Sequence, residues 1–348
     1  GNLDPLRLDL GSNTGIFIFT DRKENRVERA VLGRASTSAR TCGAYDIFGR
    51  VSDLKRFVSE RDPKRIAVNF SETIAVCDGI SHTDYLKLVD ILGDKYAKRI
   101  VSAENVITDF RTRRVMSEIV YFGELCKETL EVMDRAFDIV EPGKTTVLDI
   151  GRWLVNQNML RGFDSMFQFL IPGVFIQDRD GHENDARGGD DYVIQRGDLI
   201  HIDFGTIHMN FRTDIKRLTY VLKEGETTLP SEIQKTFDEA LRGRELFRKN
   251  IKVGRTAGET FEMLKEKLEE AGFYYNTKGQ FDTSANPEKT QINFYFHPLG
   301  NSWPVDGVGP SIIRNSDTAH LKMDDVVVTG RGVEFLYPPM KQIRLIHK

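Results

Sequence analysis

The sequence has few cysteines, no long apolar run and little net charge, and each of these absences excludes a class of protein. Its 348 residues include three cysteines, Cys42, Cys77 and Cys126, which are widely separated. An odd number of scattered cysteines without a Cys-x-x-Cys pair argues against a disulfide framework or a cysteine zinc site. We therefore expect reduced thiols that are buried as small apolar side chains, as in a cytoplasmic protein.

Membranes and nucleic acids are excluded as expected partners by hydropathy and charge. No apolar run approaches the roughly 18 residues of a membrane-spanning helix, and no signal-peptide pattern opens the sequence. The formal net charge is −3, which gives no electrostatic reason to expect nucleic acid or an anionic membrane. Hydrophobic residues make up 40% and charged residues 29% of the chain, as expected for a soluble globular protein.

The length suggests two domains, and the first part of the chain alternates between strand and helix patterns. The patterns predict a strand hairpin at 14–33, with a polar turn at Asp21–Asn25, and a further strand at 65–71. An amphipathic helix is predicted at 83–100, and a polar, basic stretch follows at 107–114. This order predicts an N-terminal α/β domain that covers residues 1–112.

The rest of the chain contains an internal repeat. Ser-Glu-Ile begins a predicted helix at 117–119 and again at 231–233, and a Gly-basic-Thr segment follows each helix, at 143–145 and 254–256. A second helix then ends in LRGF or EAGF, and the offsets between the copies are 114, 111 and 110 residues. After each helix pair come predicted strands, at 173–177 and 193–222 and at 291–296 and 324–346. Four landmarks in the same order predict one unit used twice about a pseudo-two-fold axis.

Residues 201–214, HIDFGTIHMNFRTD, have a hairpin pattern that includes two aspartates. A turn centred on His208–Met209 would place Asp203 directly opposite Asp214, with Cβ atoms roughly 5 Å apart. Two carboxylates at this short distance on a half-buried face repel each other, and a divalent cation would offset the repulsion. The alternative is that one aspartate caps a turn while the other faces water.

Three residues near the C-terminus are candidate partners for this pair. His297 ends an aromatic strand, Glu334 lies within an apolar strand, and His347 follows a basic strand at the chain end. Each has a plainer interpretation. A lone histidine at a strand end, such as His297, is usually structural, strand alternation allows Glu334 to face outward, and His347 can be a surface residue.

The segments GDLIHIDFG and RTDIKR resemble the metal-binding hairpin of the M24 metallopeptidases, which include aminopeptidase P, prolidase and methionine aminopeptidase, together with metal-free creatinase. The resemblance extends over essentially the whole chain. It implies an α+β fold of two domains: a creatinase-type N-terminal α/β domain at 1–112 and a pita-bread domain at 113–348. The pseudo-two-fold of that fold matches the internal repeat.

The resemblance also implies roles for individual residues. Asp203 and Asp214 would bind a pair of divalent metals such as Mn, Co or Zn, with His297 as third ligand and Glu334 as fourth; another register places Arg331 at the fourth position. His297 and Glu334 would also serve the chemistry. The fifth ligand, a glutamate, is missing, and His347 is the only donor nearby.

The substrate-binding residues that the family would supply are also changed. The histidine that usually follows the third ligand is replaced within SWPVD, which makes Asp306 a candidate, and Trp303 would line or cover a substrate pocket. His182 lies near the position of a further family histidine, but several residues upstream of it.

The sequence therefore supports three hypotheses. The first is a metal-dependent peptidase of the Xaa-Pro aminopeptidase or prolidase type, in which a metal-activated water attacks a peptide carbonyl. The second, favoured by the missing ligands, is a catalytically silent relative that binds a peptide or small ligand. The third is metal-free C–N hydrolysis of the creatinase type, against which the paired aspartates argue. The resemblance also implies a homodimer.

Overall fold

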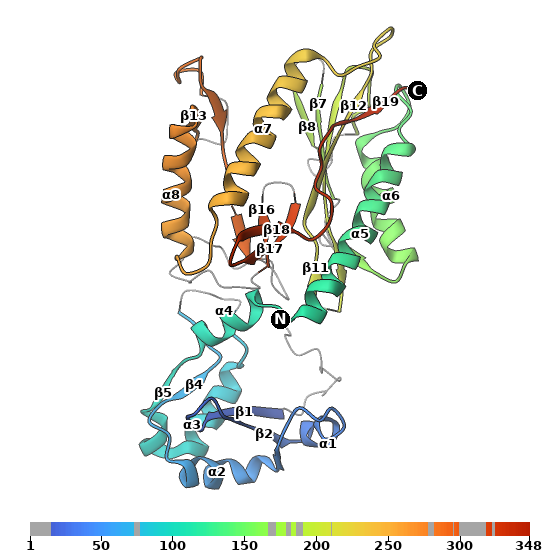
Figure 1. Ribbon diagram of the computed structural model, residues 1–348. Coiled ribbons are helices and arrows are strands. Elements are labelled where there is room, and N and C mark those ends of the chain that lie inside the picture. Colours follow the sequence, from blue (N-terminus) through green and yellow to red (C-terminus); the bar gives the residue numbers. More distant parts are fainter. Residues whose placement is uncertain are drawn as a thin grey trace. The chain divides into compact units, whose positions relative to one another are not determined.

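The computed structural model describes residues 15–72, 77–165, 172–178, 182–185, 191–209, 211–277, 282–294, 296–298, 318–321 and 324–348 (Figure 1). Of residues 111–112, 183–185, 296–298 and 318–321 it describes the backbone alone. The chain divides into two compact units, one that ends at Thr108 and one that runs from Asp109 to Lys348. Among the described residues, no helix combines the length and the apolar character that a membrane-spanning segment requires.

The N-terminal unit is an α/β arrangement of short elements. Its elements are β1 (Gly15–Asp21), β2 (Val27–Gly33), α1 (Ala35–Ala39), β3 (Ile47–Gly49), a 3-10 turn (Val51–Asp53), α2 (Leu54–Arg61), β4 (Ile66–Val68), α3 (His82–Ala97), β5 (Ile100–Ser102) and the first part of α4 (Glu104–Thr112), within which the unit ends. Strands β1 and β2 form the predicted hairpin, and β3 extends it into a sheet of three strands. The basic stretch at 107–114, expected only as a polar segment, lies mostly in α4.

The second unit begins with the first predicted helix pair and its strands. The elements are α5 (Met116–Asp138), α6 (Val147–Leu160), β6 (Asp164–Ser165), β7 (Gly173–Gln177), β8 (Glu183–Asp185), β9 (Leu199–Phe204), β10 (Thr206–His208), β11 (Phe211–Arg212) and β12 (Ile215–Val221). The second half follows the same order with α7 (Ser231–Asn250), α8 (Ala257–Glu270), β13 (Phe273–Tyr275), β14 (Thr290–Ile292), β15 (Phe296–Pro298), β16 (Thr318–Leu321), β17 (Asp324–Thr329), β18 (Gly332–Phe335) and β19 (Arg344–Ile346).

The two halves share a helix-start signal as well as an element order. Helix α6 is capped by Thr146, whose hydroxyl accepts from the backbone N–H of Asp149 while the Asp149 carboxylate accepts from that of Thr146. Thr256 and Glu259 form the same capping box at the start of α8. The two threonines are 110 residues apart, the offset also found at the helix ends. The repeat thus corresponds to equivalent local structure.

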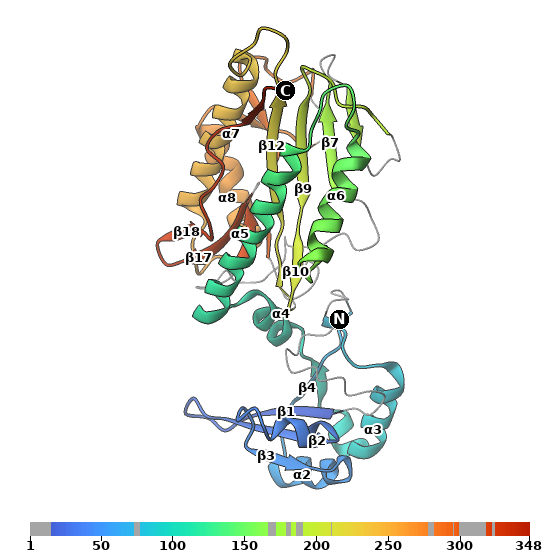
Figure 2. The same ribbon diagram turned by 90° about the vertical axis from the view of Figure 1, so that its right-hand side faces the viewer.

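A five-stranded sheet in the order β19-β12-β9-β7-β8 lies at the centre of the first half, and a four-stranded sheet, β15-β16-β17-β18, belongs to the second. Helices α5 and α6 lie across one face of β7, β9 and β12 (Figure 2). Strand β9 alternates between buried and half-buried residues, so one side faces these helices and the other faces away from them.

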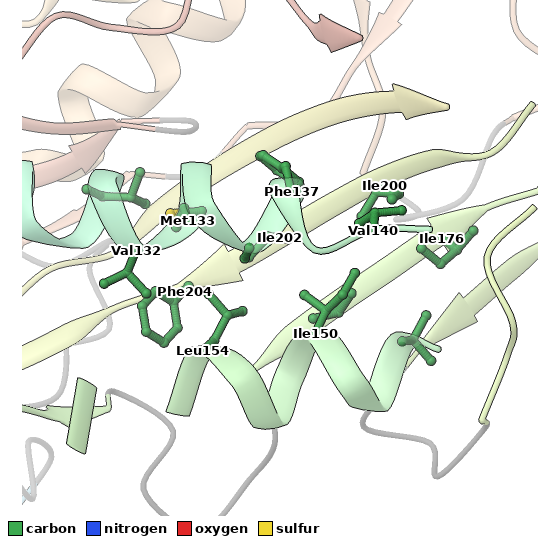
Figure 3. Packing of buried hydrophobic residues seen from close by; sticks show 14 of the residues in the cluster. Val132, Met133, Phe137, Val140, Ile150, Leu154, Ile176, Ile200, Ile202 and Phe204 are labelled. Atoms are coloured by element: carbon green, nitrogen blue, oxygen red, sulfur yellow. The ribbon is translucent and has the colours of Figure 1, made fainter. Parts of the chain in front are cut away.

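Apolar side chains form the core on the helix-facing side of the sheet. Figure 3 shows side chains of α5 and α6 in contact with those of the strands beneath them. The labelled residues are Val132, Met133, Phe137, Val140, Ile150, Leu154, Ile176, Ile200, Ile202 and Phe204. Because Ile200, Ile202 and Phe204 take this side of β9, strand alternation sends His201 and Asp203 to the opposite face.

Candidate charged site

The hairpin that carries Asp203 and Asp214 has a different register from the one expected. Asp203 on β9 lies opposite Lys216 on β12, and His208 lies opposite Phe211. The prediction that the two aspartates face each other directly is therefore wrong, because the chain reverses one residue later than assumed. Met209, with φ 48°, begins the reversal, and the Phe211 side chain is buried against α5.

The corrected register still places both aspartates on one face. Asp214 directly precedes β12 and lies two residues before Lys216, so both side chains reach the same face, and Asp214 becomes a diagonal neighbour of Asp203. Lys216 Nζ lies 3.2 Å from Asp203 Oδ1 and 2.8 Å from Asp214 Oδ1. All three side chains are largely buried. We call Asp203, Asp214 and Lys216 the lysine centre.

The lysine centre does not fit the metal pair that the sequence suggested. A cation shared by both aspartates would bind close to Lys216 Nζ, which already contacts one oxygen of each carboxylate, and the positive charge of the ammonium repels it. Among the residues the structure describes, no three His, Cys, Asp or Glu side chains gather in a way that would hold a metal ion. The repulsion between the aspartates is offset by an ammonium group.

A second ionic cluster lies beside the first. The fully buried Asp324, at the start of β17, accepts from Arg217 Nη1 and from Arg244 Nη1, both at 3.0 Å. Arg217 follows Lys216 on β12, and Arg244 comes from α7. We call Asp324, Arg217 and Arg244 the arginine centre. Sequence reasoning missed it, although two aspartates at the head of the apolar run DDVVV are a signal that carboxylates enter a buried strand.

Asp325 connects the two halves of the unit at the edge of the lysine centre. Its Oδ2 accepts from the backbone N–H of Asp214 at 3.1 Å and from the Cys126 thiol at 3.6 Å, and its own N–H donates to the Tyr337 hydroxyl at 2.8 Å. Burial, reinforced by the Asp325 charge, raises the pKa of the Cys126 thiol well above its ordinary value. Cys126 therefore stays a neutral thiol that donates a hydrogen bond.

An aromatic pair lies next to the lysine centre on the same face. The rings of Phe175 on β7 and His201 on β9 are stacked, with centroids 5.4 Å apart and planes 24° apart. Gly173, opposite Asp203, makes room for this ring, because a Cβ added there would lie 2.7 Å from the Phe175 ring. The two rings therefore stack on each other beside the charged group.

Comparison with known proteins agrees with this architecture. Residues 120–339, more than half of the chain, match the sequence profile of the metallopeptidase family M24. This chain belongs to family M24. No curated protein matches its sequence.

Solved structures resemble the M24 chain over nearly its whole length. The X-Pro aminopeptidase from Thermotoga maritima MSB8 is 18% identical with a TM-score of 0.61, over 93% of this chain and 88% of that one. The Xaa-Pro dipeptidase from Bacillus anthracis is 14% identical, with a TM-score of 0.62 and coverages of 97% and 91%. The prolidase from Pyrococcus horikoshii OT3 is 15% identical, with a TM-score of 0.60 and coverages of 94% and 89%. At these identities the likeness establishes the pita-bread fold alone.

The other residues expected at the M24 site fall into two groups. The backbone of His297 lies in β15 opposite His320, but its side chain lies outside the described residues, as do Trp303 and Asp306 entirely. Their expected roles stay predictions. Glu334 is described: its side chain is 43% exposed and forms an ion pair with Arg331 Nη2 at 2.6 Å. None of its described contacts reaches the lysine centre.

Two histidines expected near the M24 site lie on the surface. His182 is exposed, and its Nδ1 lies 3.3 Å from Asp178 Oδ2. His347 is exposed and follows β19, which pairs with β12 only from Thr219 to Val221. Val221 is five residues beyond Lys216, or about 17 Å along a strand. The described structure does not bring either histidine to the aspartates.

Proposed function

We propose that this M24 protein binds a peptide or a small peptide-like ligand without metal-dependent hydrolysis. The contact that carries the proposal is that of Lys216 Nζ with both Asp203 and Asp214. The family and fold support a peptide as the ligand class, since the similar structures are named as peptidases that act at Xaa-Pro bonds.

The chemistry of the lysine centre is the reason for separating binding from hydrolysis. A two-metal hydrolase needs cations with open coordination positions, which lower the pKa of a bound water and polarise the scissile carbonyl. An ammonium group supplies one positive charge and three N–H donors but no coordination position. Lys216 therefore neutralises the aspartate pair without providing a means to activate water.

The aromatic pair gives the proposed ligand a place to bind. Phe175 and His201 lie on the same face as Asp203, and their rings stack on each other. Proline rings and other flat apolar groups pack well on aromatic faces, while backbone amides can reach the neighbouring charged groups. Binding at this face would use side chains that the described structure already holds in position.

A metal-dependent Xaa-Pro aminopeptidase or prolidase is the second candidate function. It is favoured by the family, by the names of the similar structures and by the two aspartates on one face. For this function Lys216 would have to leave both carboxylates, and further ligands would have to come from His297 or from other residues outside the described set.

The test compares metal content, hydrolysis and binding in the same preparation. The full chain would be analysed for metals after dialysis with and without Mn²⁺, assayed with Xaa-Pro dipeptides and tripeptides, and titrated calorimetrically with those peptides. We expect substoichiometric metal, no hydrolysis, and peptide binding that EDTA does not change.

Two variants make the outcome decisive. Phe175→Ala should weaken peptide binding by about tenfold, since it removes one aromatic contact of the size measured for ring stacking. The surface variant Glu141→Gln, which breaks only an exposed ion pair with Lys144, should bind as the unchanged protein does. Stoichiometric Mn²⁺ together with Xaa-Pro hydrolysis that Asp203→Asn abolishes would overturn the proposal in favour of the peptidase.

A further inference from the structure

We infer that Lys216 is the group that keeps divalent cations out of this site, and that removing its charge turns Asp203 and Asp214 into a divalent-cation site. The inference deepens the proposed function and rests on it, because it takes the unchanged protein to be metal-free. According to this inference, the Lys216 side chain is the reason why the charged site does not form the metal centre expected from the family.

The position of Lys216 Nζ is the first argument. It lies 3.2 Å and 2.8 Å from one oxygen of each carboxylate, so it occupies the point between them where a shared cation would bind. The strand register fixes this placement, because Lys216 is directly opposite Asp203 and two residues from Asp214. The ammonium group thus lies where a bound cation would lie and is also positively charged, but it carries half the charge of a divalent ion.

The carboxylates are held by contacts that do not involve Lys216, which is the second argument. Asp203 lies on β9, which is paired with β7 on one side and β12 on the other. The backbone N–H of Asp214 donates to Asp325 Oδ2 at 3.1 Å. A variant at position 216 should therefore retain both carboxylates on one face, already placed for a shared ion.

The electrostatic balance gives the direction of the effect. Lys216 supplies one positive charge between two largely buried carboxylates, so a variant without that charge leaves more of their mutual repulsion uncompensated and needs a cation more than the unchanged protein does. Carboxylate oxygens are hard ligands that suit Mn²⁺, and water can complete its coordination. Alanine at position 216 also leaves the space of the lysine side chain for the ion and its waters.

The experiment measures metal binding directly and does not depend on activity. Lys216→Ala and the unchanged full chain would be dialysed against EDTA, then titrated with MnCl₂ by isothermal calorimetry and followed by thermal unfolding. We expect Lys216→Ala to bind Mn²⁺ and to gain at least about 5 °C in Tm at saturating metal, and the unchanged chain to do neither.

Matched variants separate charge from shape. Lys216→Arg keeps the positive charge and should not bind Mn²⁺. Lys216→Ala combined with Asp214→Asn removes one ligand and should lose at least tenfold in Mn²⁺ affinity. Lys144→Ala removes an exposed lysine that pairs with Glu141, and it should show no metal response. If Lys216→Ala does not fold, Lys216→Gln keeps an uncharged hydrogen-bond donor there and takes its place in the same titration.

The outcomes distinguish this inference from the proposed function. A folded Lys216→Ala or Lys216→Gln that binds no Mn²⁺ overturns the inference and leaves the proposed function intact. Mn²⁺ binding by the unchanged chain through Asp203 and Asp214 overturns both. Mn²⁺ binding by the alanine or glutamine variant that Asp214→Asn weakens, with none by the unchanged chain, establishes Lys216 as the excluding group.

Discussion

The lysine centre and the arginine centre lie on neighbouring residues of one strand, yet they balance charge in opposite ways. In the first, one cation, Lys216, lies between two carboxylates. In the second, two cations, Arg217 and Arg244, hold one carboxylate, Asp324. Strand alternation sends Lys216 and Arg217 to opposite faces of β12, so the two centres form on opposite sides of the strand and share no side chain.

The two centres also differ in what they connect. The lysine centre lies within a single hairpin, where its ion pairs join residues only 2 and 13 positions apart. The arginine centre joins β12, α7 and β17 through bonds between residues 107 and 80 positions apart. The arginine centre therefore ties α7 and β17 to β12, whereas the ion pairs of the lysine centre close within one hairpin.

Asp324→Ala should produce the largest loss of stability. It leaves two arginines without the carboxylate that both contact, and breaking a buried pair from one side costs about 3–5 kcal/mol. Urea unfolding of the variant measures the change. Lys144→Ala, at an exposed pair, should change stability by less than about 0.5 kcal/mol. A loss below about 1 kcal/mol for Asp324→Ala would contradict the structural role of the arginine centre.

Asp214→Asn should have a smaller effect, because Lys216 keeps Asp203 as a partner. We expect a loss of about 1.5–3 kcal/mol, the size of one hydrogen bond to a charged group. The same urea titration provides the measurement. If this variant proves as unstable as Asp324→Ala, the lysine centre supports the fold as strongly as the arginine centre, and the contrast between them fails.

Tyr220→Phe should have the smallest effect at neutral pH and tests a buried hydroxyl group on β12. The Tyr220 hydroxyl donates to Glu226 at 3.1 Å, and its removal should cost about 1 kcal/mol. Burial, with the Glu226 contact, raises the pKa of Tyr220 to about 12. An unfolded tyrosine loses its proton near pH 10, so the unfolded state binds fewer protons than the folded one between pH 10 and 12.

The stability that Tyr220 contributes should therefore be fully present below pH 10 and fall as the pH rises toward 12. Phenylalanine does not titrate, so the advantage of the unchanged chain over Tyr220→Phe should shrink across this range. Unfolding in urea at pH 7, 10 and 11 would measure it. A constant difference between the two proteins would show that ionisation of Tyr220 is no harder in the fold than outside it.

The sequence predicted the elements well because their signals are local. Periodicity and the repeated Ser-Glu-Ile and Thr landmarks predicted α5 to α8 to within a few residues, and the N-terminal hairpin formed with its turn as predicted. The M24 fold followed from the motif around Asp203. These features depend on residues that are close together along the chain, so a single sequence contains all the information needed to predict them.

The site itself was less predictable, since its partners are set by register and by distant strands. A reversal one residue later than assumed replaced Asp214 by Lys216 as the partner opposite Asp203. A shift of this size is not visible in a pattern of alternating residues, because two registers that differ by two residues keep the same faces buried. The arginine centre requires knowing that β17 and α7 meet β12, which no local pattern contains.

The order of these contacts along the chain has a consequence for synthesis. The hairpin with Lys216 and Arg217 leaves the ribosome long before Asp324 and Asp325, which lie near the C-terminal end of this sequence. Helices α6 and α8 each start from their own capping box, so each half can begin to form helix independently. We expect closure of the long-range ionic bonds to be the late event, with Arg217 hydrated until β17 arrives.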